Sequence, residues 1–448
     1  SLDPKVRDLI TEGLVMKRSI AVLGKAGVGK TSAVKAFARE VGLGNIAGVP
    51  RTTQIIDLKM ANLASGTKYV GTIEKAVATI VKAAREEGVI FFIDELHSMK
   101  GIGTSSEQSN DITQYIKTPL ELGEMIIIGT DTTSEFNTAF SQDPAFKQRF
   151  KQVVVQAPTG ENLLNILRER IKKEGLWMPE ENVLQAAVQY SHQYSLTTAQ
   201  PRAAINLVRT GYAKIITRGL DQALDMDTLK EAVQADYRVD PSEFERPLMR
   251  QKLKKGFEEY LEKEVIGQKR AKSAIKKMWR RKVTNTGDDT TLNSVLLVGP
   301  PGIGKSSIAE ISAKLMGYEK SVIHMNQFGT ALDVETFRSE VHSALDEHPI
   351  MVLIFDEIEK AHPKVQQAVL EMLEKGEFTV QRKLNGGGVQ ILEVSAKNAV
   401  FILTGNAASA FIVNNAQDGI DISEKRLARA LIEPTETSNG IDAAILSR

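Results

Sequence analysis

Two stretches of the sequence repeat one glycine-rich pattern, in which GxxxxGK is followed by threonine or serine. The first copy consists of Gly24, Lys25, Ala26, Gly27, Val28, Gly29, Lys30 and Thr31. The second copy consists of Gly299, Pro300, Pro301, Gly302, Ile303, Gly304, Lys305 and Ser306. This pattern is typical of a P-loop, which binds nucleotide phosphates. An apolar run precedes each copy and a helix-compatible stretch follows it, so we interpret both as nucleoside triphosphate sites rather than turns that bind nothing.

Each loop contains the groups that hold phosphate and magnesium. Its glycines permit backbone conformations in which successive N–H groups point at an anion, and the following helix adds the positive end of its dipole. We expect Lys30 and Lys305 to contact the β- and γ-phosphates. The hydroxyls of Thr31 and Ser306 are candidate ligands of Mg²⁺. ATP and Mg²⁺ are therefore the predicted cofactors.

A pair of acidic residues ends an apolar run downstream of each loop. The first pair is Asp94 and Glu95, and the second is Asp356 and Glu357. In nucleotide-hydrolysing sites such a pair divides the work: one acid holds magnesium and the other polarises the water that attacks the γ-phosphate. We therefore expect Asp94 and Asp356 to be metal ligands, and Glu95 and Glu357 to be catalytic.

Apolar runs of strand type alternate with longer amphipathic stretches, which is typical of a parallel sheet with helical crossovers. In the first half of the chain these runs are Ile20–Leu23, Gln54–Leu58, Val89–Ile93, Met125–Ile128 and Val153–Val155. In the second half they are Val295–Val298, Val322–Met325, Met351–Phe355 and Val400–Leu403. The two series agree in order and in the polar residues at their ends. The sequence therefore predicts an α/β protein with a duplicated P-loop module.

The predicted boundaries follow from the stretches between the runs. Helical patterns dominate after the first module, in Leu163–Lys173, Glu181–Tyr190, Arg202–Ile216 and Met226–Gln234. Prolines then break the pattern, and a further helix-like stretch, Leu248–Glu264, follows. We expect a first large subdomain at 1–156, a small helical subdomain at 157–240, a linker and lead-in helix at 241–264, and a second large subdomain at 265–448.

Composition excludes several classes of protein. The 448 residues include 42% hydrophobic and 25% charged residues, as ordinary globular proteins do, and the net charge is +1. This charge provides no general attraction to nucleic acid or to anionic membranes. The absence of cysteine excludes disulfides, thiolate metal sites and cysteine catalysis. Because the sequence shows neither a long apolar run nor a signal-peptide pattern, we predict a cytoplasmic protein that does not enter a membrane.

The segments around the acid pairs resemble those of Clp-type AAA+ unfoldases. Phe92–Gly103 is similar to the Walker B segment of the family's first ring, and Asp356–Pro363 is similar to that of its second ring. Leu261–Gln268 is similar to the start of the second-ring module. The resemblance covers nearly the whole chain. It implies two tandem AAA+ modules, a homohexamer of stacked rings, and ATP-driven unfolding, threading or remodelling of polypeptides through a central channel.

Three further residues take sensor roles by this resemblance. Asn406 matches the sensor 1 residue that orients the attacking water in the second module. In the first module Thr132 is our candidate, although Asp131 beside it departs from the family and leaves the choice of sensor side chain open. Arg202, at the start of a predicted helix, resembles the sensor 2 arginine that reports the γ-phosphate, with a solvated helix residue as the alternative.

Two arginines resemble the arginine fingers that act on the ATP of a neighbouring subunit. They are Arg149 in the first module and Arg448 in the second. The family carries a pair in the first module, but Gln148 occupies the first position of that pair here. An arginine finger is worth about 10³–10⁵ in rate in related enzymes, so we expect a slower first ring. Because the second small subdomain does not follow Arg448, we expect the sequence to be part of a longer chain.

The predicted substrate contact differs between the modules. Lys68, Tyr69 and Val70 resemble the pore loop of the first ring, where an aromatic side chain packs on polypeptide; a tyrosine on a surface helix is the alternative. The corresponding part of the second module, residues 328–347, contains no such aromatic loop, and we interpret Phe328 and Phe337 there as core residues. The second ring is therefore predicted to act mainly as an ATP-driven or assembly ring.

The same fold serves other functions, so two alternatives stay open. One is a nucleic-acid motor or loader, which the near-neutral charge disfavours. The other is a slow nucleotide-gated scaffold, which the intact acid pairs disfavour. An adaptor is compatible with the leading prediction, whereas no tripeptide for docking a peptidase is evident after Asn406.

Overall fold

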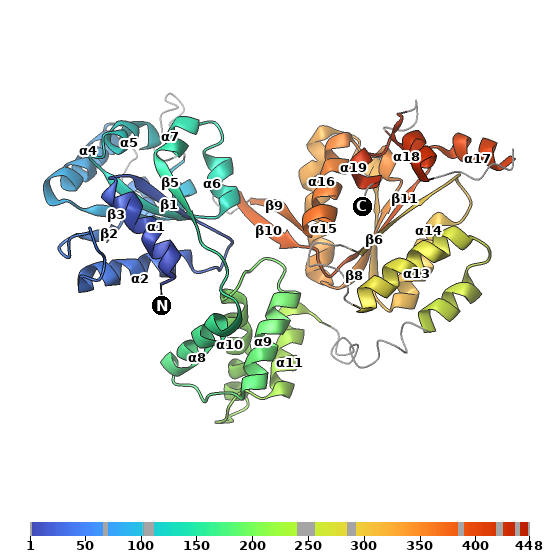
Figure 1. The fold of residues 1–448 in the computed structure, drawn as a ribbon, viewed down its shortest axis with the longest axis horizontal. Helices are drawn as coiled ribbons and strands as arrows, with labels where there is room; N and C mark the ends of the chain where they lie inside the picture. The colour runs from blue at the N-terminus through green and yellow to red at the C-terminus, as the bar shows by residue number, and fades with distance from the viewer. Residues whose placement is uncertain are drawn as a thin grey trace. The chain divides into compact units, whose positions relative to one another are not determined.

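The computed structural model describes residues 2–65, 70–100, 102, 112–239, 256–284, 293–383, 389–417, 424–434 and 440–446. The chain forms two compact units, which are Ser1–Glu174 with Thr198–Ile205, and Gly175–Thr197 with Asn206–Arg448. Each unit contains its own parallel sheet, the first in blue to teal and the second in yellow to red in Figure 1.

The sheet of the first unit has 5 strands in the order β2-β3-β4-β1-β5, and every neighbouring pair is parallel. Its strands are β1 (Ser19–Leu23), β2 (Ile55–Asp57), β3 (Ile90–Asp94), β4 (Ile126–Asp131) and β5 (Phe150–Val154). Each strand overlaps an apolar run predicted from the sequence. Strand β1 lies between β4 and the edge strand β5, so the first P-loop, which follows β1, lies at the carboxyl ends of the strands.

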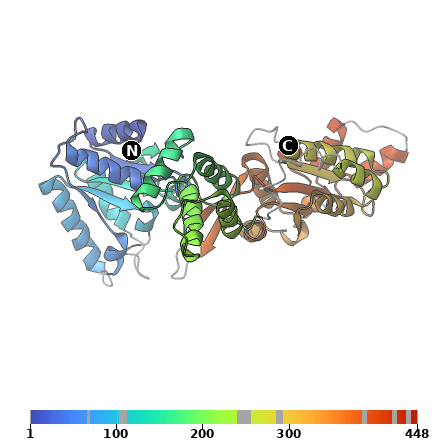
Figure 2. The same ribbon diagram turned by 90° about the horizontal axis from the view of Figure 1, so that it is seen from below.

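Helices cover both faces of this sheet (Figures 1 and 2). They are α1 (Pro4–Val15), α2 (Lys30–Leu43), α3 (Met60–Ser65), α4 (Val70–Glu87), α5 (Ile112–Glu121), α6 (Thr133–Ala139) and α7 (Pro144–Gln148), with the 3-10 helix η1 at Leu96–Met99. Successive strand residues point to opposite faces. Phe91 of β3 therefore packs in one core with α4 and α5, and Phe92 packs in another with α1 and α2. Because both faces of the sheet are buried, the strands and the residues at their carboxyl ends are held in fixed positions.

The second unit repeats this architecture. Its parallel sheet has the order β6-β11-β8-β7, which corresponds to β1-β4-β3-β2 of the first sheet. The strands are β6 (Asn293–Val298), β7 (Glu319–His324), β8 (Met351–Asp356) and β11 (Val400–Gly405), and an antiparallel hairpin joins β9 (Glu377–Lys383) to β10 (Val389–Ser395). The matching strand order confirms the predicted duplication.

The helices of the second sheet also divide between two cores. They are residues 256–264, α13 (Lys269–Thr284), α14 (Lys305–Met316), α15 (Val334–Glu347), α16 (Pro363–Lys375), α17 (Ser409–Gln417), α18 (Glu424–Ile432) and α19 (Ala443–Leu446), with 3-10 turns η3 (Met325–Gln327), η4 (Ala331–Asp333) and η5 (Ile358–Lys360). Phe355 of β8 packs with α15 and α16, whereas Ile354 packs with α13 and α14. The lead-in helix begins earlier in our prediction, but its residues 248–255 lie outside the described part of the chain.

The described part of the chain that follows β5 in sequence and precedes the second module is mainly helical, as predicted. It forms α8 (Gly160–Lys173), α9 (Glu181–Tyr194), α10 (Arg202–Thr217) and α11 (Met226–Tyr237), and α9 packs against α11. The predicted fold class, two tandem P-loop modules with flanking helices, is therefore confirmed, whereas the domain boundaries stay a prediction. Among the described residues, no helix has the length and apolarity needed to cross a membrane.

Candidate functional site

The fold brings three strand ends together at each nucleotide site. In a parallel sheet, ligands bind beside the carboxyl ends of the strands. In the first module, β1 leads into the P-loop, β3 ends at the acid pair, and β4 lies between them. The backbone N–H of Gly24 donates to the carbonyl of Asp131 at 3.3 Å, and Gly299 donates to Gly405 at 3.2 Å in the second module. Each loop is therefore hydrogen-bonded to the corresponding strand of its own module, β4 in the first and β11 in the second.

Each P-loop ends at a glycine that starts a helix. Gly29 has a φ of 100° and Gly304 a φ of 88°, and these left-handed conformations favour glycine. Helices α2 and α14 then begin at Lys30 and Lys305, so the backbone N–H groups of their first turns face the loop. This arrangement has the geometry of helix termini that bind anions, and anion binding here stays a prediction.

A hydroxyl and a carboxylate lie side by side in both sites. Thr31 Oγ1 donates to Asp94 at 3.0 Å (Oδ1) and 3.2 Å (Oδ2), and Ser306 Oγ donates to Asp356 Oδ1 at 2.9 Å. These oxygens come from the helix after the loop and from the end of the adjacent acid-bearing strand. Oxygen donors of this type suit Mg²⁺, so the residues present fit the predicted ion.

A second hydroxyl supports each carboxylate from the middle strand. Thr130 on β4 donates to Asp94 Oδ1, and Thr404 on β11 donates to Asp356 Oδ1 at 2.6 Å. Neither threonine was among the predicted site residues. A signal for them was present, because both modules place threonine two residues before the predicted sensor position. The two threonines orient the carboxylates that were predicted to hold the metal.

The P-loop lysines differ in their partners. Lys30 Nζ donates to the carbonyls of Gly24 and Lys25 at 2.8 and 3.0 Å. Lys305 Nζ also contacts its own loop, and in addition donates to Asn406 Oδ1 at 2.7 Å. Burial lowers the pKa of both lysines, although neighbouring carboxylates oppose this effect. The second module thus links its phosphate-binding lysine directly to the predicted sensor residue.

Both predicted catalytic glutamates adopt a rare backbone conformation. Glu95 and Glu357 have a φ of 60°, in the left-handed region that side chains other than glycine seldom occupy. Such strain concentrates at functional sites, where the surrounding structure holds it. Asn406 Nδ2 donates to Glu357 Oε1 at 2.6 Å, and the hydroxyl of Thr404 accepts the backbone N–H of Glu357 at 3.1 Å. Glu357 is therefore fixed at both its backbone and its carboxylate.

Thr132 occupies the position of Asn406 but makes different contacts. It follows Asp131, which pairs with Leu23 at the end of β1, as Asn406 follows Gly405. The hydroxyl of Thr132 donates to Glu135 Oε2 at 2.7 Å and accepts the N–H of the same residue at 3.1 Å, so it caps α6. Its sensor role therefore stays a prediction.

Asp131 forms a buried pair with His97. Asp131 Oδ1 lies 2.8 Å from His97 Nδ1, Asp131 Oδ2 accepts the N–H of His97 at 2.8 Å, and the aspartate side chain has no exposed surface. Burial raises the pKa of Asp131, although the hydrogen bonds from His97 oppose this. Burial would lower the pKa of His97, but the hydrogen bond to Asp131 and nearby carboxylates raise it overall. Sequence reasoning noted Asp131 as a departure and missed its partner.

Arg202 lies beside the first P-loop. Its backbone N–H donates to the carbonyl of Gly27 at 3.3 Å, and the N–H of Ala199 donates to the carbonyl of Ala26 at 2.9 Å. A Cβ atom at Gly27 would meet Arg202 and Thr198 side-chain atoms at 2.9 Å, so glycine permits this close approach. The guanidinium charge of Arg202 also acts to lower the pKa of Lys30. These contacts bring the predicted sensor 2 residue to the nucleotide site.

The remaining predicted residues lie away from these contacts or outside the described residues. Arg149 pairs with Glu121 at 2.7 Å, and its predicted action on a neighbouring subunit is not tested by one chain. Val70 begins α4, whereas Lys68, Tyr69 and Arg448 lie outside the described residues. The two aromatic residues interpreted as core in the second module, Phe328 and Phe337, are 3% and 0% exposed, which confirms that interpretation.

Two sheets, each with a P-loop and an acid pair at its carboxyl edge, define a tandem P-loop nucleotide-binding protein. Family models agree with this class. Residues 20–156 match the ATPase family associated with various cellular activities (AAA), and residues 290–442 match the AAA domain of the Cdc48 subfamily.

Relatives and solved structures narrow the class. The chain is 26% identical to a probable ATP-dependent Clp protease ATP-binding subunit of Chlamydia pneumoniae, over 97% of this chain and 60% of the relative. It is 28% identical to the chloroplastic chaperone protein ClpC2 of Arabidopsis thaliana, over 88% of this chain and 50% of the relative. The chain thus spans about half to three fifths of the length of these relatives.

The fold matches solved structures of Hsp104. For the S. cerevisiae Hsp104-ADP complex the TM-score is 0.66 at 23% identity, and the match covers 96% of this chain and 76% of that chain. For the S. cerevisiae Hsp104:casein complex the TM-score is 0.57 at 23% identity, with the same coverage. These structures show the same fold. The two AAA matches and the Clp relatives identify the chain as a member of the Clp/Hsp100-type double AAA+ ATPase family.

Proposed function

We propose that this chain is the ATP-hydrolysing motor region of a hexameric protein that unfolds, threads or remodels polypeptides. The observation that carries the proposal is the pair of P-loop sites, each with a hydroxyl–carboxylate pair and a glutamate in the left-handed conformation. Similarity to Clp ATP-binding subunits and Clp chaperones supports a polypeptide as the substrate. A cytoplasmic location, predicted from composition, belongs to the same proposal.

In this proposal different residues of the chain bind the phosphates, orient the reacting groups and accept the proton. The P-loop N–H groups and Lys30 or Lys305 hold the phosphates, and Arg202 contacts the γ-phosphate in the first module. Thr31 with Asp94, and Ser306 with Asp356, hold Mg²⁺, which neutralises charge on the phosphates when bound. The two glutamates accept a proton from the attacking water. Because Glu357 already contacts Asn406, that glutamate is oriented before the reaction begins.

Other parts of the proposal concern neighbouring subunits and the substrate. Arg149 and Arg448 would stabilise charge on the ATP of the adjacent subunit in a hexamer. Lys68, Tyr69 and Val70, the last of which is the first residue of α4, would form the substrate contact of the first ring. The core positions of Phe328 and Phe337 support a second ring without an aromatic grip. We therefore propose that the first ring makes most of the contacts with the polypeptide, and that the second ring acts mainly through ATP hydrolysis or assembly.

Stimulation of ATP hydrolysis by two kinds of polymer tests the proposed substrate. We expect a permanently unfolded protein to increase the steady-state hydrolysis rate and single-stranded DNA to leave it unchanged. Tyr69→Ala should remove the stimulation by protein while the basal rate persists. Stimulation by DNA alone would contradict the proposal and favour a nucleic-acid motor.

A further inference from the structure

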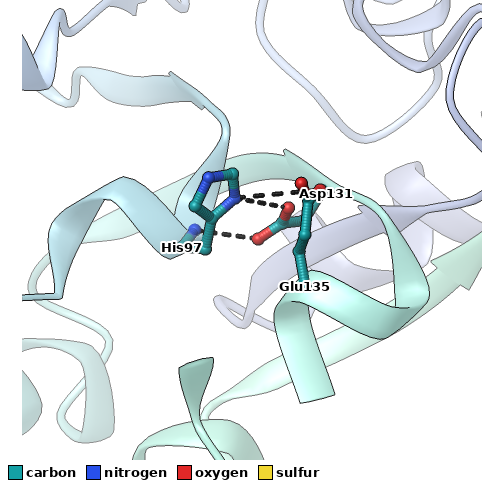
Figure 3. A group of neighbouring side chains, drawn as sticks. All are labelled: His97, Asp131 and Glu135. Carbon is teal, nitrogen blue, oxygen red and sulfur yellow. Dashed lines mark hydrogen bonds and ion pairs between the residues drawn. The ribbon is translucent and has the colours of Figure 1, made fainter. Parts of the chain in front are cut away.

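A separate cluster of potential metal ligands lies in the first module. His97 on η1, Asp131 at the end of β4 and Glu135 on α6 each provide one ligand atom, and these atoms lie within 4.8 Å of one another. Figure 3 shows the imidazole of His97 facing both carboxylates. The proposed phosphate and Mg²⁺ contacts use none of these three residues.

The distances within the cluster suit a small metal ion. His97 Nδ1 lies 2.8 Å from Asp131 Oδ1 and 3.9 Å from Glu135 Oε2. Zn²⁺ binds imidazole nitrogen and carboxylate oxygen at about 2.0–2.2 Å, so two ligands of a tetrahedral ion lie about 3.4 Å apart. The two observed distances bracket that separation. The third separation, between the Asp131 and Glu135 oxygens, is within 4.8 Å. Rotation of the side chains would therefore be needed to bring all three ligand atoms to one ion.

The carboxylates are held in place by neighbouring donors. The backbone N–H of Thr132 donates to Asp131 Oδ1 at 3.0 Å, and the N–H of His97 donates to Asp131 Oδ2 at 2.8 Å. The hydroxyl of Thr132 donates to Glu135 Oε2 at 2.7 Å. Hydrogen bonds of this kind orient the ligands of metal sites and strengthen binding. The cluster thus has both ligands and the residues that support them.

A proton alone does not satisfy the cluster. A protonated Nδ1 can donate to Asp131, but 3.9 Å is too long for a hydrogen bond to Glu135. The Asp131 side chain has no exposed surface and that of Glu135 is only 13% exposed, so water contributes little to neutralising either carboxylate. Lys30 of the P-loop also contributes positive charge near both carboxylates. A divalent ion, unlike a proton, would contact all three ligand atoms at once.

The second module provides an internal comparison. By strand register and spacing, its residues at the same positions are Glu359, Gly405 and Ser409. This set contains one carboxylate and no imidazole. Glu359 is 1% exposed and accepts the backbone N–H of Asn406 at 2.8 Å. The ligand set is therefore a property of the first module and does not follow from the shared fold.

We propose that His97, Asp131 and Glu135 bind one Zn²⁺ ion, or a divalent metal with the same ligand preference, in the first module. One nitrogen and two oxygen donors suit zinc, with water as the fourth ligand. Mg²⁺ prefers near-octahedral sets of oxygen ligands, so it belongs at Thr31 and Asp94 and competes poorly here. The site is thus distinct in both residues and metal from the nucleotide site.

Zinc titration of the full chain tests the proposal without relying on ATP hydrolysis. Nucleotide-free protein in excess Mg²⁺ is titrated with Zn²⁺ against a chromophoric chelator. We expect one tight site per chain, and His97→Ala, Asp131→Asn and Glu135→Gln should each weaken it at least about tenfold. The control is His324→Ala, because His324 lies 3.5 Å from Asp356 at the other nucleotide site. That substitution should leave the tight site unchanged.

Two results would overturn the proposal. One is the absence of tight zinc binding by the wild-type chain, or its loss in His324→Ala alone. The other is a Glu135→Gln variant that binds zinc as tightly as wild type. Because Glu135 is partly exposed, this variant keeps the test decisive even if Asp131→Asn fails to fold. Thermal unfolding of each variant in Mg²⁺ without zinc checks that its fold is retained.

Discussion

The two nucleotide sites share one backbone plan but connect their catalytic residues differently. In the second module Asn406 bridges Lys305 and Glu357, at 2.7 and 2.6 Å. In the first module Thr132, at the same register position, contacts Glu135 on α6. The common hydroxyl–carboxylate pairs show that the shared fold brings together, in both modules, the residues proposed to hold the metal. The difference shows that the contacts of the proposed catalytic glutamate change with single residues at the end of the middle strand.

The residues at positions 131 and 97 in the first module, and at 405 and 359 in the second, account for part of the difference between the two sites. A Cβ atom at Gly405 would lie 3.0 Å from Glu359 Oε2, so a carboxylate side chain at 405 would meet another carboxylate. Asp131 is accommodated at the same position because His97 replaces that glutamate and hydrogen-bonds to it. Burial raises the pKa of Glu359, which agrees with a site that already disfavours a second negative charge. The two positions therefore depend on each other.

The largest expected difference concerns the stability of the second module, in the segment that corresponds to the predicted pore loop of the first. Phe328 is 3% exposed and its ring lies 5.4 Å from that of Phe337, whereas Leu332 nearby is 89% exposed. Phe328→Ala should lower the free energy of unfolding by about 3–5 kcal/mol, and Leu332→Ala by less than about 0.5 kcal/mol. Chemical denaturation measures both. A stable Phe328→Ala protein that loses polypeptide translocation would contradict the core assignment.

The next prediction concerns the two predicted sensors. Asn406→Ala removes the contact that orients Glu357, so hydrolysis by the second module should fall by about a hundredfold, as it does when an oriented donor is removed. Thr132→Ala should slow the first module by less than about tenfold, because its hydroxyl contacts Glu135. Each rate is measured with the other module's glutamate replaced by glutamine. Equal losses would show that the two sensors act alike.

Replacement of Arg202 should act on nucleotide affinity in the first module. Loss of a charged contact costs about 1.5 kcal/mol or more, so Arg202→Ala should weaken ATP binding by about tenfold. Arg209→Ala, also exposed but two turns further along the same helix and away from Gly27, is the matched control and should bind ATP normally. Fluorescent-nucleotide titration with the second P-loop disabled by Lys305→Ala provides the measurement. Unchanged affinity in Arg202→Ala would support the solvated-residue alternative.

The smallest predicted effect is a loss of hydrolysis that should be equal in the two modules. Thr130→Val and Thr404→Val each remove one hydroxyl that supports a carboxylate, so both modules should lose about fivefold in hydrolysis, or about 1 kcal/mol. Single-module rates test this, measured as for the sensors. A large loss in one module and none in the other would show that the equivalence of the two threonines is wrong.

The sequence predicted those features that depend on neighbouring residues in the chain. The strand β3 and its acid pair, for example, follow from one apolar run that ends in Asp94. The contact of Gly27 with Thr198 and the pairing of His97 with Asp131 join distant segments, so no local pattern indicated them. The role of Thr404 could have been predicted from the sequence, because an alignment of the two modules by their strands matches Thr404 with Thr130. The core position of Phe328 was also predicted from the sequence, and its burial confirms it.

The most direct test of the account is ATP hydrolysis by Glu95→Gln, Glu357→Gln and the double variant, measured beside wild type in one assembly assay. Each single variant should retain the hydrolysis of its other module and hold ATP unhydrolysed at the altered site. The double variant should be slower than wild type by about 10²–10⁴ and still bind ATP. Wild-type turnover in the double variant would contradict the assignment of both glutamates, and with it the proposed pair of hydrolytic sites.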